Sequence, residues 1–479
     1  MKRIFFVIII FLPVVMYSQN YEKEYEDFSK TAKSDYHSFR DDCNRKYADF
    51  LRTAWEWYEG KVPIPLPKEL SPVPLSPYRN NGKENAVEVV PIEVLHPVKP
   101  APQPKPVAPV RELPDDEDHF NIDFWGITCS VRLPVTASIG INNCDPELLA
   151  DGWQHLSKVN LNNAIRDCLE IRIRYGLCDW AYLCFLDKLC KEFTADRNGG
   201  TLLMAYLYCQ SGYQMRLGVD GNILRMLFSS HYQIYNQGYF EINGLYFYPW
   251  GGSSDLLKIC DATFEGETPM TLEISKDIIL GGEMSDERII KSDGYEDIRA
   301  VSHVPISLIN FYSSYPSASI NGDPMTRWAL YANTPLAQKT RELLYPDLKK
   351  KIDRLSQCEA VDRLLNLVQT GLEYEYDDTV WGYDRAFFAE ESLYYPFCDC
   401  EDRSILFSRL VRDLLGLDVA LVYYPGHLAT AVHFTENVGG DSILIEGRKF
   451  IVCDPTYIGA PVGSQMPDLD YDKIRVFVL

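Results

Sequence analysis

The stretch CDCEDRSILFSRLVRDLLG, residues 398–416, decides how the C-terminal part of this chain folds. Asp399 suits a helix N-cap, and the two acids after Cys400 suit the first turn, beside the positive end of the helix dipole. Apolar residues at helical spacing then mark a buried face: Ile405, Leu406, Leu410 and Leu414. The pattern therefore predicts a helix that begins at Cys400.

A cysteine at the start of a helix can serve as a nucleophile. The free backbone N–H groups and the helix dipole favour the thiolate form of Cys400, whereas the neighbouring carboxylates oppose it, so activation needs a nearby base. His427 opens a predicted strand in PGHLATAVHF, and Asp454 ends another in FIVCDPTY. A thiol, an imidazole and a carboxylate that orients the imidazole are the parts of a Cys-His-Asp triad. The predicted catalytic residues are therefore Cys400, His427 and Asp454.

These motifs resemble those of the transglutaminase-like superfamily, whose usual pattern is Gly-x-Cys-x-Asp before a helix, then a histidine that opens a strand, then Asp-Pro-Thr. Residues 400–402 match the cysteine motif, His427 the histidine and residues 454–456 the aspartate motif, although Cys398 stands where glycine is common. The resemblance covers roughly residues 353–479. It implies a papain-like α+β core with the cysteine helix packed on an antiparallel sheet.

The resemblance also implies a reaction on amide or peptide bonds through a thioester. Bacterial members of the superfamily act as proteases, amidases or cross-linking enzymes. We expect hydrolysis rather than cross-linking, because no sequence feature guarantees that water is excluded. We expect no cofactor and no metal, because no Asp-x-Asp-x-Asp-Gly loop is present. The alternative is a non-catalytic binding or scaffold protein of the cell envelope that keeps the fold.

Other roles for the same cysteines and histidines stay open. Cys398, Cys400, His427 and Cys453 would make a tetrahedral zinc set, but the Cys-x-Cys spacing is unusual and Asp454 is left without a role. Cys398 and Cys453 would alternatively form a disulfide beside the site.

The sequence also offers a second candidate base and candidate oxyanion donors. His433 follows His427 by six residues on the same predicted strand, hence on the same face, and is a second candidate for the base. The backbone N–H of Cys400 is a candidate oxyanion donor. Trp381 or Tyr383 would supply a side-chain donor, although both also read as aromatic walls of a cleft.

The composition excludes some classes of protein. The chain has 479 residues with a formal net charge of -21, so nucleic acid is not an expected partner. A content of 46% hydrophobic and 24% charged residues is typical of globular domains. The 13 cysteines are an odd number, which leaves at least one thiol unpaired in a monomer. The expected partner is instead the protein or peptide substrate that the resemblance implies, or a component of the cell envelope.

The N-terminal part of the chain predicts export and a long helix. Residues 1–18 have the charged end and apolar run of a signal peptide, and no later segment resembles a transmembrane helix, so we expect a periplasmic or extracellular protein. Residues 20–60 contain an eleven-residue repeat that places Tyr47, Phe50 and Ala54 on one face of an amphipathic helix. Residues 21–59 would dock on the main body or on a partner. The proline-rich residues 61–118 predict an extended linker, or a segment along the surface.

Three regions follow the linker. Residues 119–254 predict an α+β domain with a hairpin at Asn243-Gly244. Residues 255–345 predict a strand-rich segment, and residues 346–479 the catalytic domain. Residues 119–254 are a candidate degenerate copy of the catalytic domain, because their stretch GGTLLMAYLYCQSGYQMRLGV aligns with SILFSRLVRDLLGLDVALVYY. The alternative is a chance similarity between two amphipathic helix–strand units. In that copy the cysteine position falls near residues 196–198, and no triad is present.

Overall fold

The computed structural model describes residues 40–67, 72–73, 77–78, 86–97, 104–105, 118–159, 161–264 and 266–479. The predicted signal peptide and the first half of the predicted N-terminal helix lie outside these residues. Residues 40–53 are helical. The named helices are α2 (Pro146–Lys158), α3 (Asn162–Arg174), α4 (Asp179–Phe193), α5 (Arg197–Gln210), α6 (Ile306–Ser313), α7 (Pro324–Asn333), α8 (Gln338–Ile352), α9 (Gln357–Gly371), α10 (Asp377–Val380), α11 (Ala389–Tyr394) and α12 (Cys400–Leu415).

The strands belong to two larger sheets and several two-stranded ribbons. The first sheet has the order β1 (Trp55–Glu59), β11 (Leu256–Cys260), β6 (Met215–Asp220), β7 (Ile223–Ser229), β10 (Leu245–Pro249) and β9 (Phe240–Ile242). The second has the order β2 (Glu88–Val89), β19 (Ser442–Ile445), β20 (Arg448–Cys453), β18 (His427–His433), β17 (Asp418–Tyr424), β21 (Arg475–Val478) and β3 (Glu93–Leu95). The ribbons pair β4 (His119–Phe124) with β5 (Ile127–Arg132), β8 (Gln233–Ile234) with β14 (Ala318–Ser319), β12 (Arg288–Lys291) with β13 (Arg299–Ser302), and β15 (Glu373–Tyr374) with β16 (Phe397–Cys398).

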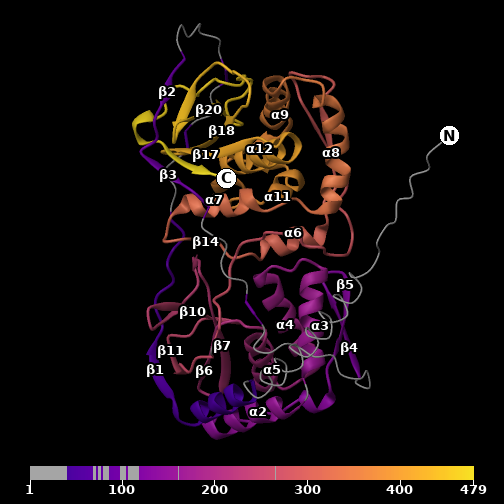
Figure 1. Ribbon diagram of the computed structural model, residues 1–479, viewed down its shortest axis with the longest axis vertical. Coiled ribbons are helices and arrows are strands. Elements are labelled where there is room, and N and C mark those ends of the chain that lie inside the picture. Colours follow the sequence, from indigo (N-terminus) through magenta and orange to yellow (C-terminus); the bar gives the residue numbers. More distant parts are fainter. Residues whose placement is uncertain are drawn as a thin grey trace, which may run out of the picture.

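The two larger sheets lie in two halves of the molecule, and each is combined with helices (Figure 1). Helix α5 packs on β6 and β7 in the first half, and α12 packs on β17 and β18 in the second. The fold is therefore a mixed α and β architecture, as the α+β prediction requires. None of the helices in the described part of the chain combines the length and the apolar character needed to cross a bilayer.

The two halves share one strand order. After α5 the chain forms β6, β7, β9, β10 and β11, and after α12 it forms β17 to β21. In both sheets the third strand of this series lies beside the fourth, followed by the second, the first and the fifth. All these neighbours pair antiparallel. The common topology supports the hypothesis of a degenerate copy, which itself stays a prediction.

The described residues from β1 to β3 lie along both halves of the molecule. Strand β1 pairs antiparallel with β11, whereas β2 and β3 pair in parallel with β19 and β21 (Figure 1). Between these strands, the Val73 N–H donates to the Gly426 carbonyl at 2.9 Å, and the Tyr78 N–H donates to the Ile458 carbonyl at 2.9 Å. We call the described parts of residues 55–97 the strap, because they join the edges of the two sheets.

The N-terminal helix differs from its prediction in length and orientation. It ends at residue 53, and the aromatic run at Trp55–Glu59 forms β1, because its alternating side chains suit a sheet edge better than a helix. The buried face of the helix is made by Tyr47, Ala48 and Leu51, whereas Phe50 is 49% exposed. The prediction was thus wrong for Phe50. These residues dock on the main body, since the Tyr47 ring contacts Trp153 and Phe264.

Residues 255–345 are also less strand-rich than predicted. They contain four short strands together with α6 and α7, and β11 belongs to the first sheet. The expected boundary at residue 346 falls inside α8, which continues through Pro346. The hairpin prediction is confirmed, because Asn243 and Gly244 join β9 to β10 with φ values of 53° and 77°.

Candidate functional site

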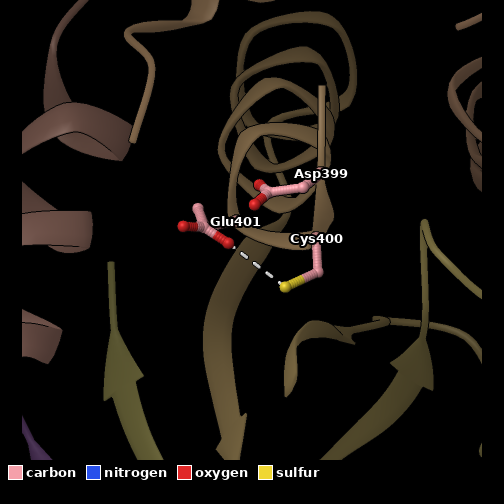
Figure 2. Close-up of side chains that lie close together, drawn as sticks. All are labelled: Asp399, Cys400 and Glu401. Atoms are coloured by element: carbon pink, nitrogen blue, oxygen red, sulfur yellow. Dashed lines mark hydrogen bonds between the residues drawn. The ribbon is translucent and has the colours of Figure 1, made fainter. Parts of the chain in front are cut away.

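Helix α12 places Cys400 as predicted, in its first turn. Asp399 is the N-cap, and Gly416 ends the helix in the left-handed conformation with φ of 65°. Cys400 is 7% exposed, and its Sγ lies 3.2 Å from Glu401 Oε2, to which it donates a hydrogen bond (Figure 2). The thiol thus lies at the positive helix end but beside an acid.

The predicted base and its orienting acid meet in the second sheet. His427 opens β18, and its Nε2 lies 2.8 Å from Asp454 Oδ2, just after the end of β20. The other Asp454 oxygen, Oδ1, accepts from the Thr456 N–H at 2.9 Å. Both side chains are buried, and Tyr424 stacks on the imidazole with ring centroids 6.2 Å apart. Because Nε2 faces the carboxylate, Nδ1 is the nitrogen left to face a thiol.

A hydrogen bond joins the cysteine helix to the histidine strand. Ser404 Oγ donates to the Leu428 carbonyl at 3.0 Å. Ser404 lies one turn after Cys400 on the same helix face, and Leu428 directly follows His427. The start of α12 and the start of β18 therefore lie at the same end of the domain. The Ser404 bond brings the first turns of α12 close to the start of β18, and the hydrogen bond of the Cys400 thiol goes to Glu401.

Gln369 is a supporting residue that the sequence analysis missed. It lies in α9, is 1% exposed, and its Nε2 donates to the carbonyls of Asp454 and Tyr457 at 2.9 Å and of Ala460 at 3.1 Å. Its Oε1 accepts from the Gly459 N–H at 3.2 Å. One side chain thus holds the loop that carries Asp454. The sequence does carry a signal for this residue: Gln369 is a polar residue one turn after Leu365, on the apolar face of the predicted helix.

Five carboxyl groups surround the first turn of α12. Burial is the first cause that raises the pKa of Asp377, to about 8, and the charge of Glu401 adds to it. Burial also raises the pKa of Asp399 and Asp402 well above the usual range, again with a contribution from Glu401. The pKa of Glu401 is raised by burial and by the charge of Asp384. From the sequence, the acids at the start of α12 are expected to cap the helix, and their burial beside Asp377 and Asp384 is not predicted.

Neither predicted oxyanion side chain faces the thiol. Tyr383 is 57% exposed, and the Trp381 ring lies 4.3 Å from the Arg385 guanidinium and packs on Tyr395. Tyr374 is a further candidate donor, because its strand, β15, pairs with β16 and places Tyr374 opposite Cys398, two residues before Cys400. Burial raises the pKa of Tyr374, and the charge at Cys400 is the next cause.

The alternative roles of the cysteines and of His433 find no matching geometry. All 13 cysteines lie in the described residues, and none of them forms a disulfide there. Cys398 Sγ lies 3.7 Å from the Glu373 carbonyl on the neighbouring strand β15. Cys453 Sγ lies 3.6 Å from the Ile451 carbonyl on its own strand, β20. Among the described residues, the candidate metal clusters contain carboxylates and Cys400 but not the predicted zinc set. His433 Nδ1 contacts the Lys449 carbonyl at 2.9 Å, away from the triad.

Comparisons with known proteins do not assign this chain to a family. No family model matches the sequence, and a search of the curated proteins returns no match.

Proposed function

We propose that this chain is an exported cysteine hydrolase of the transglutaminase-like kind, which cleaves amide or peptide bonds through a thioester. The observation that carries the proposal is the buried pair of His427 and Asp454, 2.8 Å apart, at the same end of the domain as Cys400. A buried carboxylate that orients an imidazole is the arrangement that keeps a base ready to accept a thiol proton.

The reaction uses only side chains of this chain. The Cys400 proton passes to His427 Nδ1 while sulfur bonds to the substrate carbonyl carbon. The C–N bond then breaks, the proton on His427 passes to the departing amine, and the acyl group stays on sulfur. Water next gives a proton to His427 as its oxygen bonds to the acyl carbon, and the C–S bond breaks to release the acid and regenerate the thiol. Asp454 holds the ring and stabilises the imidazolium throughout.

Two further groups support this sequence of steps. The Tyr374 phenol near Cys400 is a candidate donor to the oxyanion that forms on the substrate oxygen. Gln369 fixes the loop of Asp454, so that the carboxylate keeps its position while charge develops on the imidazole. Both are positioned by elements that precede the triad in the sequence, namely β15 and α9.

A second candidate function is a non-catalytic envelope scaffold. The observation in its favour is that Cys400 is 7% and His427 3% exposed, and that the thiol donates to an acid. Such a thiol would stay protonated and out of reach of a peptide. An enzyme of this geometry has to open the surface over the triad before a substrate binds.

Alkylation of the mature protein at several pH values, mapped by mass spectrometry, separates the two functions. The enzyme requires fast labelling of Cys400 at neutral pH, slowed in His427→Ala. His433→Ala is the matched control, because this histidine lies on the same strand but contacts the Lys449 carbonyl and the Phe450 ring, away from Asp454. Equal labelling in all three proteins, or a Cys400 that does not react, would refute the hydrolase and support the scaffold.

A further inference from the structure

The carboxyl groups around the first turn of α12 form one continuous cluster. Three overlapping sets have ligand atoms within 4.8 Å of one another: Asp377 with Asp384 and Glu401, Asp377 with Asp399 and Asp402, and Asp399 with Cys400 and Glu401. Glu401 and Asp377 each belong to two sets. The loop after α10 and the start of α12 therefore bring their acids together, although these are up to 25 residues apart in the sequence.

Little positive charge balances this cluster within the described part of the chain. Arg327 Nη1 binds Asp384 Oδ2 at 2.7 Å. Arg385 is engaged by Glu391 at 2.7 Å, and Arg403 donates to the backbone carbonyls of residues 369 and 372. Burial of several carboxylates against a single guanidinium is unfavourable unless another cation or protons reduce the charge.

Two oxygens in the cluster accept from no N–H or S–H group of the described residues. They are Asp399 Oδ1 and Glu401 Oε1, on residues that are 6% and 2% exposed. Figure 2 shows the Asp399 carboxyl group directed toward the side of the helix end where Glu401 lies. Asp402, in contrast, uses both oxygens, which accept from the N–H groups of Phe387 at 2.7 Å and Asp399 at 3.3 Å. The Asp399 and Glu401 carboxyl groups lie within hydrogen-bonding reach of each other, so these atoms are satisfied only by a proton that the two groups share or by a cation that both bind.

We infer that Asp377, Asp384 and Glu401 bind a divalent cation, with Asp399 beside Glu401 at the edge of the site, and that Ca²⁺ fits them best. Two oxygens on one Ca²⁺ lie at most about 4.8 Å apart, twice the metal–oxygen distance of about 2.4 Å, and the sets above satisfy this limit. Carboxylates without a fixed octahedron suit Ca²⁺ better than Mg²⁺, and oxygens suit it better than zinc. The Asp384 side chain is 23% exposed, so the ion has an entry from solvent.

Such a site escapes a search for linear motifs. Its acids come from α10, the loop that follows it and both sides of the α12 start, rather than from one loop of alternating acids. The bound ion would tie the loop at residues 377–384 to the helix that carries Cys400. The inference concerns binding and stability, and it holds whether or not the chain is an enzyme.

Terbium luminescence and thermal unfolding test this inference on the full mature protein after treatment with a chelator. Trp381 is a built-in sensitiser, because it lies four residues after Asp377 and its backbone N–H donates to the backbone carbonyl of Asp377 at 2.7 Å. We expect Tb³⁺ emission on tryptophan excitation, displacement of that emission by Ca²⁺, and a higher Tm with Ca²⁺ than with chelator. Asp377→Asn and Glu401→Gln, which keep side-chain shape, should weaken binding by at least about tenfold. Asp378→Asn is the matched control, since this neighbour is exposed.

The outcomes separate cation binding from its alternatives. Equal Tb³⁺ affinity in Asp377→Asn and Asp378→Asn would overturn the inference, because the ion would then sit on the acidic surface. A Glu401→Gln protein that is more stable than wild type in chelator, with no response of the wild type to Ca²⁺, would also overturn it. The cluster would in that case be held by protons shared between carboxyl groups. Thermal unfolding in chelator shows whether each variant folds, so that loss of binding is not confused with loss of structure.

Discussion

The Gln369 side chain allows a stability prediction with a worked magnitude. Gln369→Leu keeps nearly the same volume but leaves three carbonyls and the Gly459 N–H without their partner. A buried polar group left unpaired costs about 1–3 kcal/mol, and some of these groups will relax toward water. We therefore expect the free energy of unfolding to fall by about 2–4 kcal/mol, a sum of one to two fully unpaired groups.

Urea unfolding followed by tryptophan fluorescence would measure this loss through the midpoint at constant slope. Gln338→Leu is the control, because Gln338 is exposed on α8 and its loss should change stability by less than about 0.5 kcal/mol. Hydrogen exchange gives a local readout, since the Gly459 amide should lose protection. A loss below about 1 kcal/mol for Gln369→Leu, with Gly459 still protected, would refute the reasoning.

Three other predictions concern the triad, the buried acids and the strap. Asp454→Asn should slow neutral-pH alkylation of Cys400 at least about tenfold with an unchanged Tm, and an unchanged rate would contradict the orienting role. Burial raises the pKa of Glu390 from 4.5 to about 7, so the folded state binds the proton more tightly and stability is lost as pH rises from about 4.5 to 7. Glu390→Gln should thus raise the Tm at pH 8 but not at pH 4, as differential scanning calorimetry would show, by an amount equivalent to at most about 3 kcal/mol; equal effects at both pH values would contradict this. Val94→Pro should free β3 from β21 and promote self-association in light scattering, whereas Val90→Pro, at a 67% exposed residue outside the strands, should not.

Features written in consecutive residues could be predicted from the sequence. The N-cap at Asp399, the helix start at Cys400 and the turn at Gly244 depend on interactions within a few residues, and the structure shows all three. The meeting of His427 and Asp454 was also predictable, because each stands at the end of a recognisable strand, and those strands pair in one sheet. Interactions between residues close in the sequence, together with the order of the strands, were sufficient to predict these features.

Features that depend on distant pairing could not be predicted in the same way. Trp55–Glu59 reads as helix because the repeat before it is helical, and only β11 turns it into a strand. The acids at Asp377 and Asp384 look like ordinary loop acids until the fold buries them beside Glu401. The predicted boundary at residue 346 falls inside α8, because the helix continues through Pro346, a residue that usually ends a helix.

The strap also has a consequence for the order in which this protein folds. Arg475 and Glu93, on β21 and β3, bond across 382 residues of chain at 2.6 Å. Closing so long a loop costs conformational entropy before the β3–β21 contacts can form and offset it. Contacts between residues so far apart in the sequence therefore slow folding. The β3 segment emerges from the ribosome early but has no partner until β21 has been made. Completion of the second sheet is therefore a late kinetic step, and a chain held before it would expose both edges of that sheet to neighbouring molecules.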